Sequence, residues 1–199
     1  MDGVIQFLSA NEALIATVIS IVALMFAILR DFILPRIFHP KIGLEGLNDQ
    51  GCINDIVTLP PFAGNSTKSR WLRLRIRNGG YFAVPARNCY VKLLQIKNPE
   101  NTIISPFNPS LLTWVGYERT YANLANNEEH YIYLIYEYEE WPWFYLAKIE
   151  IPSAFECESA FREAGIYTFK VGVYGDNING KEYEFRIRLT GKWNELKFD

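Results

Sequence analysis

Two patterns of apolar residues divide this chain. No charged residue occurs from Ala13 to Leu29. After Pro40, apolar residues instead recur at every second position in short runs. A long unbroken apolar run is typical of a membrane-spanning helix, whereas alternation is typical of β-strands with one buried face. We therefore predict an N-terminal membrane and juxtamembrane segment, residues 1–38, followed by a β-domain, residues 39–199.

The apolar run predicts a single transmembrane helix from about Glu12 to Leu34. At 1.5 Å per residue, a helix of this length crosses the roughly 30 Å hydrocarbon core with some tilt. A cleaved signal peptide is the competing interpretation. It requires a basic N-terminal region and a shorter apolar stretch, whereas the residues before this run offer only Asp2 and Glu12 as charges.

The charges beside the helix predict its orientation. No Lys or Arg precedes the helix, and three basic residues follow it closely, at Arg30, Arg36 and Lys41. The side richer in Lys and Arg usually stays in the cytoplasm. We expect a single-pass protein of the cell membrane whose soluble domain is cytoplasmic.

Small side chains recur along the helix at steps of four and three residues. These positions share one stripe of a helix, and they are Ser9, Ala13, Ala16, Ser20, Ala23 and Ala27. Small residues let helix backbones approach closely in lipid, where packing drives association. The stripe predicts a homo-oligomer with a seam at Ala13, Ala16, Ser20, Ala23 and Ala27.

The segment from Arg70 to Ile96 shows the alternation most clearly. Leu72, Leu74 and Ile76 share one face of the expected strand. Asn78-Gly79-Gly80 and Pro85 then interrupt it, so residues 81–87 are expected to be a connection or an edge. Further strands are expected over residues 41–47, 89–93, 103–104, 111–115, 131–138, 145–151, 167–174 and 183–189, and short helices over 152–164 and 117–127.

These elements predict an all-β protein, an antiparallel β-sandwich preceded by one transmembrane α-helix. The stretches "LRLRIRNGGYFAVPARNCYVKL" and "GIYTFKVGVYGDN" resemble the immunoglobulin-like domains of the bacterial and archaeal cell-adhesion-related kind. The resemblance covers about residues 70–96 and 164–190. It implies an immunoglobulin-like fold in a small membrane-anchored prokaryotic protein, and it implies no activity.

The composition offers few catalytic or metal-binding groups. The chain has two histidines, His39 and His130, and three cysteines, Cys52, Cys89 and Cys157, with no Cys-x-x-Cys pair. We expect reduced core thiols, no zinc or redox site, no cofactor and no enzyme. The acidic residues Glu128, Glu129, Glu137, Glu139 and Glu140 are expected to be a solvated loop and strand end, and Asp176 to Gly180 a hairpin turn rather than a calcium loop.

The remaining candidate site is a set of arginines. Arg73, Arg75 and Arg77 share one face of their strand, and Arg186 and Arg188 share one face of the last strand. If both strands lie in one sheet, the five side chains form a patch suited to phosphate or carboxylate. The alternative is ordinary pairing with Glu182 and Glu184 on a wet sheet face. Likewise, the aromatic run Trp141 to Leu146 is expected in the core or at a domain contact, with the lipid headgroup layer as the alternative.

Three functions are compatible with these features. The first is a non-enzymatic, membrane-anchored β-sandwich module for protein interaction or self-assembly. The second is a membrane effector or sensor that binds an anionic, nucleotide-like small molecule on the arginine face. The third is an extracellular adhesion domain. A net charge of −2 gives no general attraction to nucleic acid, so no nucleic-acid partner is expected.

Overall fold

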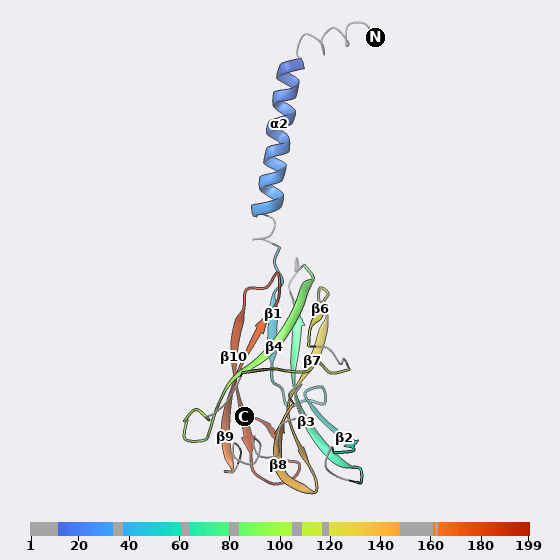
Figure 1. The fold of residues 1–199 in the computed structure, drawn as a ribbon, viewed down its shortest axis with the longest axis vertical. Coiled ribbons are helices and arrows are strands. Elements are labelled where there is room, and N and C mark those ends of the chain that lie inside the picture. The colour runs from blue at the N-terminus through green and yellow to red at the C-terminus, as the bar shows by residue number, and fades with distance from the viewer. Residues whose placement is uncertain are drawn as a thin grey trace. The chain divides into compact units, whose positions relative to one another are not determined.

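The structure, a computed structural model, describes residues 12–33, 38–60, 64–79, 84–104, 109–116, 120–147, 161 and 163–199. The chain divides into two compact units, Met1–His39 and Pro40–Asp199. Figure 1 shows the helix of the first unit and the strands of the second.

Among its described residues, the first unit contains one apolar helix, as the sequence predicts. α2 (Glu12–Ile28) continues as a π-helical turn, η1 (Leu29–Ile33). The window Leu14–Asp31 has a mean hydropathy of 2.1 and is long and apolar enough to cross a membrane, a property that N-terminal signal sequences share. The predicted seam residues Ala16, Ser20, Ala23 and Ala27 are exposed on this helix; the Ser20 hydroxyl donates to the carbonyl of Ala16, 2.8 Å away, within the helix itself.

The second unit is a sandwich of two antiparallel sheets, which confirms the predicted fold class. The first sheet has the order β1-β3-β7-β8, with β2 also paired to β3. Its strands are β1 (Ile42–Glu45), β2 (Ile53–Thr58), β3 (Thr67–Asn78), β7 (Glu129–Tyr138) and β8 (Trp141–Leu146).

The second sheet has the order β11-β10-β9-β4-β5, with β6 also paired to β4. Its strands are β4 (Ala86–Lys97), β5 (Ser110–Leu111), β6 (Ala122–Leu124), β9 (Gly165–Tyr174), β10 (Lys181–Leu189) and β11 (Lys197–Phe198). In each sheet every described pairing is antiparallel.

Several predicted elements differ from the observed ones. The helix expected over 117–127 is wrong where the structure describes it, because Ala122–Leu124 forms β6 against β4. Residues 103–104 make only the isolated bridge from Ile103 to Lys97, and the strand expected over 111–115 is reduced to Ser110–Leu111 and a bridge at Trp114. Strands β2 and β11 were not expected. The helix expected over 152–164 lies almost wholly outside the described residues.

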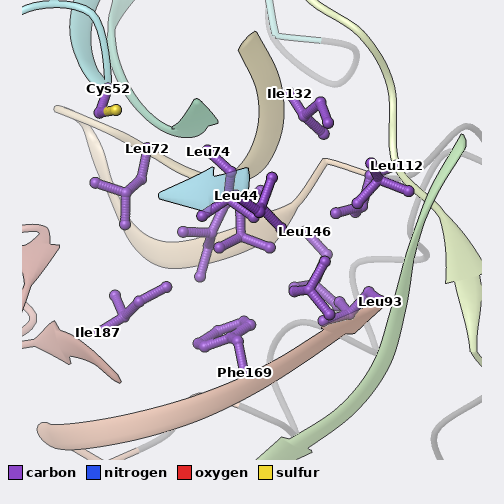
Figure 2. Close-up of a cluster of buried hydrophobic side chains, with 14 of the residues drawn as sticks. Leu44, Cys52, Leu72, Leu74, Leu93, Leu112, Ile132, Leu146, Phe169 and Ile187 are labelled. Atoms are coloured by element: carbon purple, nitrogen blue, oxygen red, sulfur yellow. The ribbon is translucent and has the colours of Figure 1, made fainter. Parts of the chain in front are cut away.

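The core fills the space between the two sheets. Apolar side chains from β3 and β7 meet those from β4, β9 and β10, and Figure 2 shows part of this cluster around Leu74, Leu93 and Phe169. The inward residues Leu72, Leu74 and Ile76 are fully buried, as the alternation in β3 predicts. At about 25 cal/mol per Å² of apolar surface, this burial is the main source of stability for the unit.

A one-residue bulge changes the side to which β7 side chains point. Leu72 pairs with Ile135 and Arg73 pairs with Tyr133, so Leu134 has no partner in β3. Side chains alternate along a strand, and opposed residues share a face. Tyr133 therefore lies on the outer face before the bulge, and Tyr136 lies on the same outer face after it. The bulge lets one strand place tyrosines outward at both odd and even positions.

Buried Asn78 closes the end of β3 at the interruption noted in the sequence. Its side-chain amide donates to the carbonyls of Val84, at 2.9 Å, and Leu124, at 3.2 Å. Its side-chain oxygen accepts from the backbone N–H of Lys41 at 3.1 Å. The Asn78 side chain thus joins the start of β1, the approach to β4 and the end of β6, and its polar atoms are hydrogen-bonded despite full burial.

Candidate functional site

The structure does not bring the five candidate arginines together. Arg73, Arg75 and Arg77 lie on β3 in the first sheet, whereas Arg186 and Arg188 lie on β10 in the second sheet. The condition for a single patch, that both strands share a sheet, is not met. The two groups point away from the core on opposite layers of the sandwich, so the predicted patch is wrong as one site.

On the first sheet, the arginines lie beside tyrosines of β7. The Arg73 guanidinium lies over the Tyr133 ring at 4.9 Å, and that of Arg75 lies over the Tyr131 ring at 5.8 Å. Arg75 also forms an ion pair with Asp49. A hydrogen bond with Tyr131, and then the nearby Asp49 carboxylate, raise the pKa of Arg75 further above its ordinary value. Through these contacts Arg73 and Arg75 pack against tyrosines of the neighbouring strand.

On the second sheet, the arginines meet the carboxylate of Asp199. Arg186 Nη2 lies 3.0 Å from Asp199 Oδ2, and Arg188 pairs with the other oxygen. The alternative of pairing with Glu182 and Glu184 is also not what the structure shows, because Glu182 forms its ion pair with Lys170. The arginines of β10 therefore tie the end of the chain to its strand.

The minor candidates take structural roles where the structure describes them. Cys52 and Cys89 are buried free thiols, and burial raises the pKa of Cys89 to about 11, far from a reactive thiolate. The Asp176 carboxylate accepts from the Asn88 amide at 2.6 Å, which fixes the β9–β10 turn against β4. His130 Nε2 lies 2.8 Å from Glu128 Oε1. The described residues contain no group of three or more His, Cys, Asp and Glu side chains that could hold a metal ion.

One acidic residue departs from the prediction of a solvated cluster. Glu129, Glu139 and Glu140 are exposed, but Glu137 is only 4% exposed. In the strand register, Glu137 lies opposite Arg70 of β3 and opposite Phe144 of β8. Arg70 is two residues from Leu72, so it lies on the same inward face of β3. Because of the bulge at Leu134, Glu137 points into the end of the sandwich rather than to solvent.

Glu137 lies in a pocket of about 280 Å³ between the β7–β8 hairpin and the loop after β10. We call this the Glu137 pocket, and its lining residues are Glu137, Tyr138, Glu139, Glu140, Trp141, Phe144, Gly191 and Trp193. The hairpin supplies six of these residues. The loop supplies the other two, and its tight path depends on positive φ at Gly191 (73°) and Asn194 (71°).

Arg70 of β3 and Asp55 of β2 form a pair that is hydrogen-bonded to the loop that lines the pocket. Arg70 donates to both carboxylate oxygens of Asp55, at 2.7 and 2.8 Å, in a two-point pair. A further N–H of Arg70 donates to the backbone carbonyl of Asn194 in the loop. The guanidinium is thus occupied by Asp55 and Asn194, and it does not make a salt bridge with Glu137 within the described part of the chain.

The electrostatics of Glu137 follow from this arrangement. Burial disfavours the charged carboxylate and raises its pKa from 4.5 to about 7, while the Asn194 backbone and the Arg70 charge oppose that rise. Its Oε1 atom is buried without a hydrogen-bond partner among the described residues. A buried carboxyl oxygen that lacks a partner is uncommon in folded proteins and is a feature of binding and catalytic sites.

The aromatic run from Trp141 to Leu146 contributes to the pocket and to both faces of the first sheet. Phe144 joins the core, in line with the prediction, and Trp141 lines the pocket. Tyr145 instead packs on the outer face with Trp71 and Tyr136. The rings of Trp71 and Tyr136 stack on each other with their centroids 4.1 Å apart. The side chain of Trp143 lies outside the described residues.

Sequence reasoning missed the Glu137 pocket for two reasons. The bulge at Leu134 reverses the inside-outside alternation before Glu137, so its burial is not visible from the pattern of "YIYLIYEYEEW". The loop of Gly191 and Trp193 is distant in sequence. The available signal was that Glu137, between Tyr136 and Tyr138, is the one charged residue in the run from Tyr131 to Tyr138.

No protein-family model matches the chain. No curated protein matches it either. One solved structure with some likeness comes from work on glycolipid glycan hydrolysis, a family 123 glycoside hydrolase from Clostridium perfringens, with 11% identity and a TM-score of 0.32. The match covers 60% of this chain, and the chain spans 20% of that protein.

This neighbour contradicts the prediction that the chain is not an enzyme, and we withdraw that prediction. At a TM-score of 0.32, the likeness transfers neither an active site nor a substrate to this chain. Membership of the immunoglobulin-like adhesion-related family stays a prediction.

Proposed function

We propose that this protein is a membrane-anchored β-sandwich recognition module that binds its partner through the Glu137 pocket. One observation supports this proposal above the others. A carboxyl group that is 96% buried, with an unpartnered Oε1, lies in a pocket whose other lining residues are mostly aromatic or acidic. Because Oε1 itself is sealed from solvent in the structure, we propose that the Glu137 side chain turns toward the pocket on binding. A bound molecule that then donates a hydrogen bond to Oε1 would offset the cost of burying that group, which is about 1–3 kcal/mol.

The proposal is tested by ligand-dependent stability of the full chain in detergent micelles. Wild type and Glu137→Gln are heated in the presence of a panel of small amines, methyl glycosides and small carboxylates. A ligand at 100 times its dissociation constant adds about 2.7 kcal/mol to the stability of the folded state. We expect at least one class to raise the melting temperature of wild type and to have less effect on Glu137→Gln.

The matched control is Glu184→Gln, since Glu184 is an exposed glutamate on β10. It should respond to the panel as wild type does. If no class stabilises wild type, or if Glu137→Gln responds equally, the pocket is not the recognition site.

We further propose that α2 anchors the module in the cell membrane with the sandwich in the cytoplasm. The support is the basic flank, with Arg30 at the end of the apolar span and Lys41 after it. Protease added to intact cells should leave the region after Lys41 intact and should digest it once the cells are opened. Digestion in intact cells would place the sandwich outside and would favour the adhesion hypothesis.

A further inference from the structure

We propose that the group recognised in the Glu137 pocket is a primary alkylammonium ion, whose N–H donates to Oε1 of Glu137. This inference rests on the proposed function and names its ligand class.

The pocket carries an excess of negative charge. Three of its described lining residues are glutamates, and none is a lysine, arginine or histidine. Two nearby cations have acidic partners, since Lys68 lies 3.5 Å from Glu139 and Arg70 pairs with Asp55, whereas Lys192 in the loop makes no salt bridge among the described residues. This leaves Glu137 and Glu140 without a salt bridge among the described residues, and an organic cation would balance them.

The geometry favours an ammonium ion over a bare metal ion. The described acidic side chains of the pocket do not form a group that could hold a metal. Oε1 of Glu137 is buried without a hydrogen-bond donor among the described residues, so once the side chain turns toward the pocket, a ligand with an N–H or O–H satisfies this acceptor. A quaternary ammonium carries neither, and a primary ammonium carries three N–H donors.

The lining fits an aliphatic stem. Trp141, Phe144 and Trp193 present aromatic surface to the pocket, and indole rings attract cations and pack against methylene groups. A volume of about 280 Å³ is just below the range of drug-sized sites, which suits a short alkylamine or the end of a longer chain. The carboxylates would fix the ammonium, and the rings would fix the stem.

Binding of this ligand should depend on pH because the ammonium pairs with the ionised form of Glu137. Below a pKa of about 7 a proton competes for the same carboxylate. The other titratable or charged groups around it are Asp55 and Arg70 from β2 and β3, Tyr138, Glu139 and Glu140 from the hairpin, and Lys192 and Glu195 from the loop. Affinity should therefore rise between pH 5.5 and pH 8.

The experiment titrates n-butylammonium chloride into the full chain in phosphatidylcholine nanodiscs at pH 8, followed by tryptophan fluorescence. We expect a saturable change, an affinity at least tenfold weaker in Glu137→Gln, and unchanged binding in Glu184→Gln. Tetramethylammonium and n-butanol should each bind at least tenfold more weakly than n-butylammonium. In wild type, lowering the pH to 5.5 should weaken binding about tenfold or more, a readout that does not depend on any variant folding.

A second arm separates two sources of the ammonium. Replacing half of the phosphatidylcholine by phosphatidylethanolamine should lower the apparent affinity for n-butylammonium if the lipid headgroup occupies the pocket. An unchanged affinity excludes the phosphatidylethanolamine headgroup and leaves a soluble amine as the source. Either result is compatible with the site.

Two results would overturn the inference: no saturable binding of n-butylammonium, or binding of equal strength in Glu137→Gln. The failure of the broader proposal looks different. If a methyl glycoside or carboxylate stabilises wild type through Glu137 while n-butylammonium does not bind, the pocket is a recognition site for another class. If nothing depends on Glu137, both proposals fail.

Discussion

The effect on stability of replacing Glu137 by Gln should depend on pH. The variant should gain stability relative to wild type when the pH is raised from 5 to 8. In the folded chain, burial raises the pKa of Glu137 from 4.5 to about 7. A carboxyl with a raised folded-state pKa binds its proton more tightly in the folded than in the unfolded chain. Its contribution to stability is complete below pH 4.5 and is lost as the pH rises to about 7.

The magnitude follows from the shift in pKa. Each pKa unit corresponds to about 1.4 kcal/mol, so the full loss approaches about 3 kcal/mol, and the part that falls between pH 5 and pH 8 is about 2.5 kcal/mol. Gln does not titrate and has nearly the same size. Any packing change that it causes is the same at both pH values, so it cancels when the two pH values are compared.

The assay is urea unfolding of the full chain in a mild detergent, followed by tryptophan fluorescence, for wild type and Glu137→Gln at pH 5 and pH 8. The stability difference, Gln minus Glu, should be about 2.5 kcal/mol more favourable at pH 8 than at pH 5. A difference that is the same at both pH values would show that Glu137 does not titrate in this window, and the buried-carboxyl reasoning would be wrong.

Three further predictions concern the rest of the chain. Asn78→Ala removes three hydrogen bonds from a buried side chain and should lower the free energy of unfolding by about 3 kcal/mol. The control Asn65→Ala, at an exposed position, should change the free energy of unfolding little. Equal urea midpoints for the two variants would contradict this prediction. Arg73→Ala should lower the free energy of unfolding by about 1 kcal/mol, because the stacking of Arg73 on Tyr133 is lost. The control Arg77→Ala, at an exposed position, should lower it by less than half of that in the same assay. A larger loss for Arg77→Ala than for Arg73→Ala would rule out the stacking argument. Crosslinking in membranes should show fewer oligomers when the stripe Ala16, Ser20 and Ala23 is changed to Leu than when the neighbouring positions Ile15, Ile19 and Val22 are changed to Leu. Equal oligomer fractions would show that the stripe does not mediate association.

The local sequence pattern correctly predicted those elements whose formation depends on neighbouring residues. The alternation around Leu72 and Leu74 gave β3 its correct inward face, and the apolar run predicted α2, because each depends on neighbouring residues alone. The pairing of β3 with β7 rather than with β10 depends on residues far apart in the chain. No local pattern carries that information, so the arginine patch was predicted in the wrong arrangement.

Short strands were missed for a related reason. β6 has three residues and β11 has two, and each exists as a partner of a long strand rather than through its own periodicity. The site was hidden by both effects together, since it needs the register of β7 beyond Leu134 and the approach of Trp193 from the other sheet.

The bulge at Leu134 also sets how this region tolerates changes in length. Removing that one residue would restore simple alternation through β7 and would rotate every later side chain of the strand by half a turn. Tyr136 and Tyr138 would then face the apolar interior, and Glu137 would face water with an ordinary carboxylate. Insertions and deletions in β7 are therefore far from neutral: a gap of one codon converts a buried acid with a pocket into a plain surface charge, although it removes none of the pocket's residues.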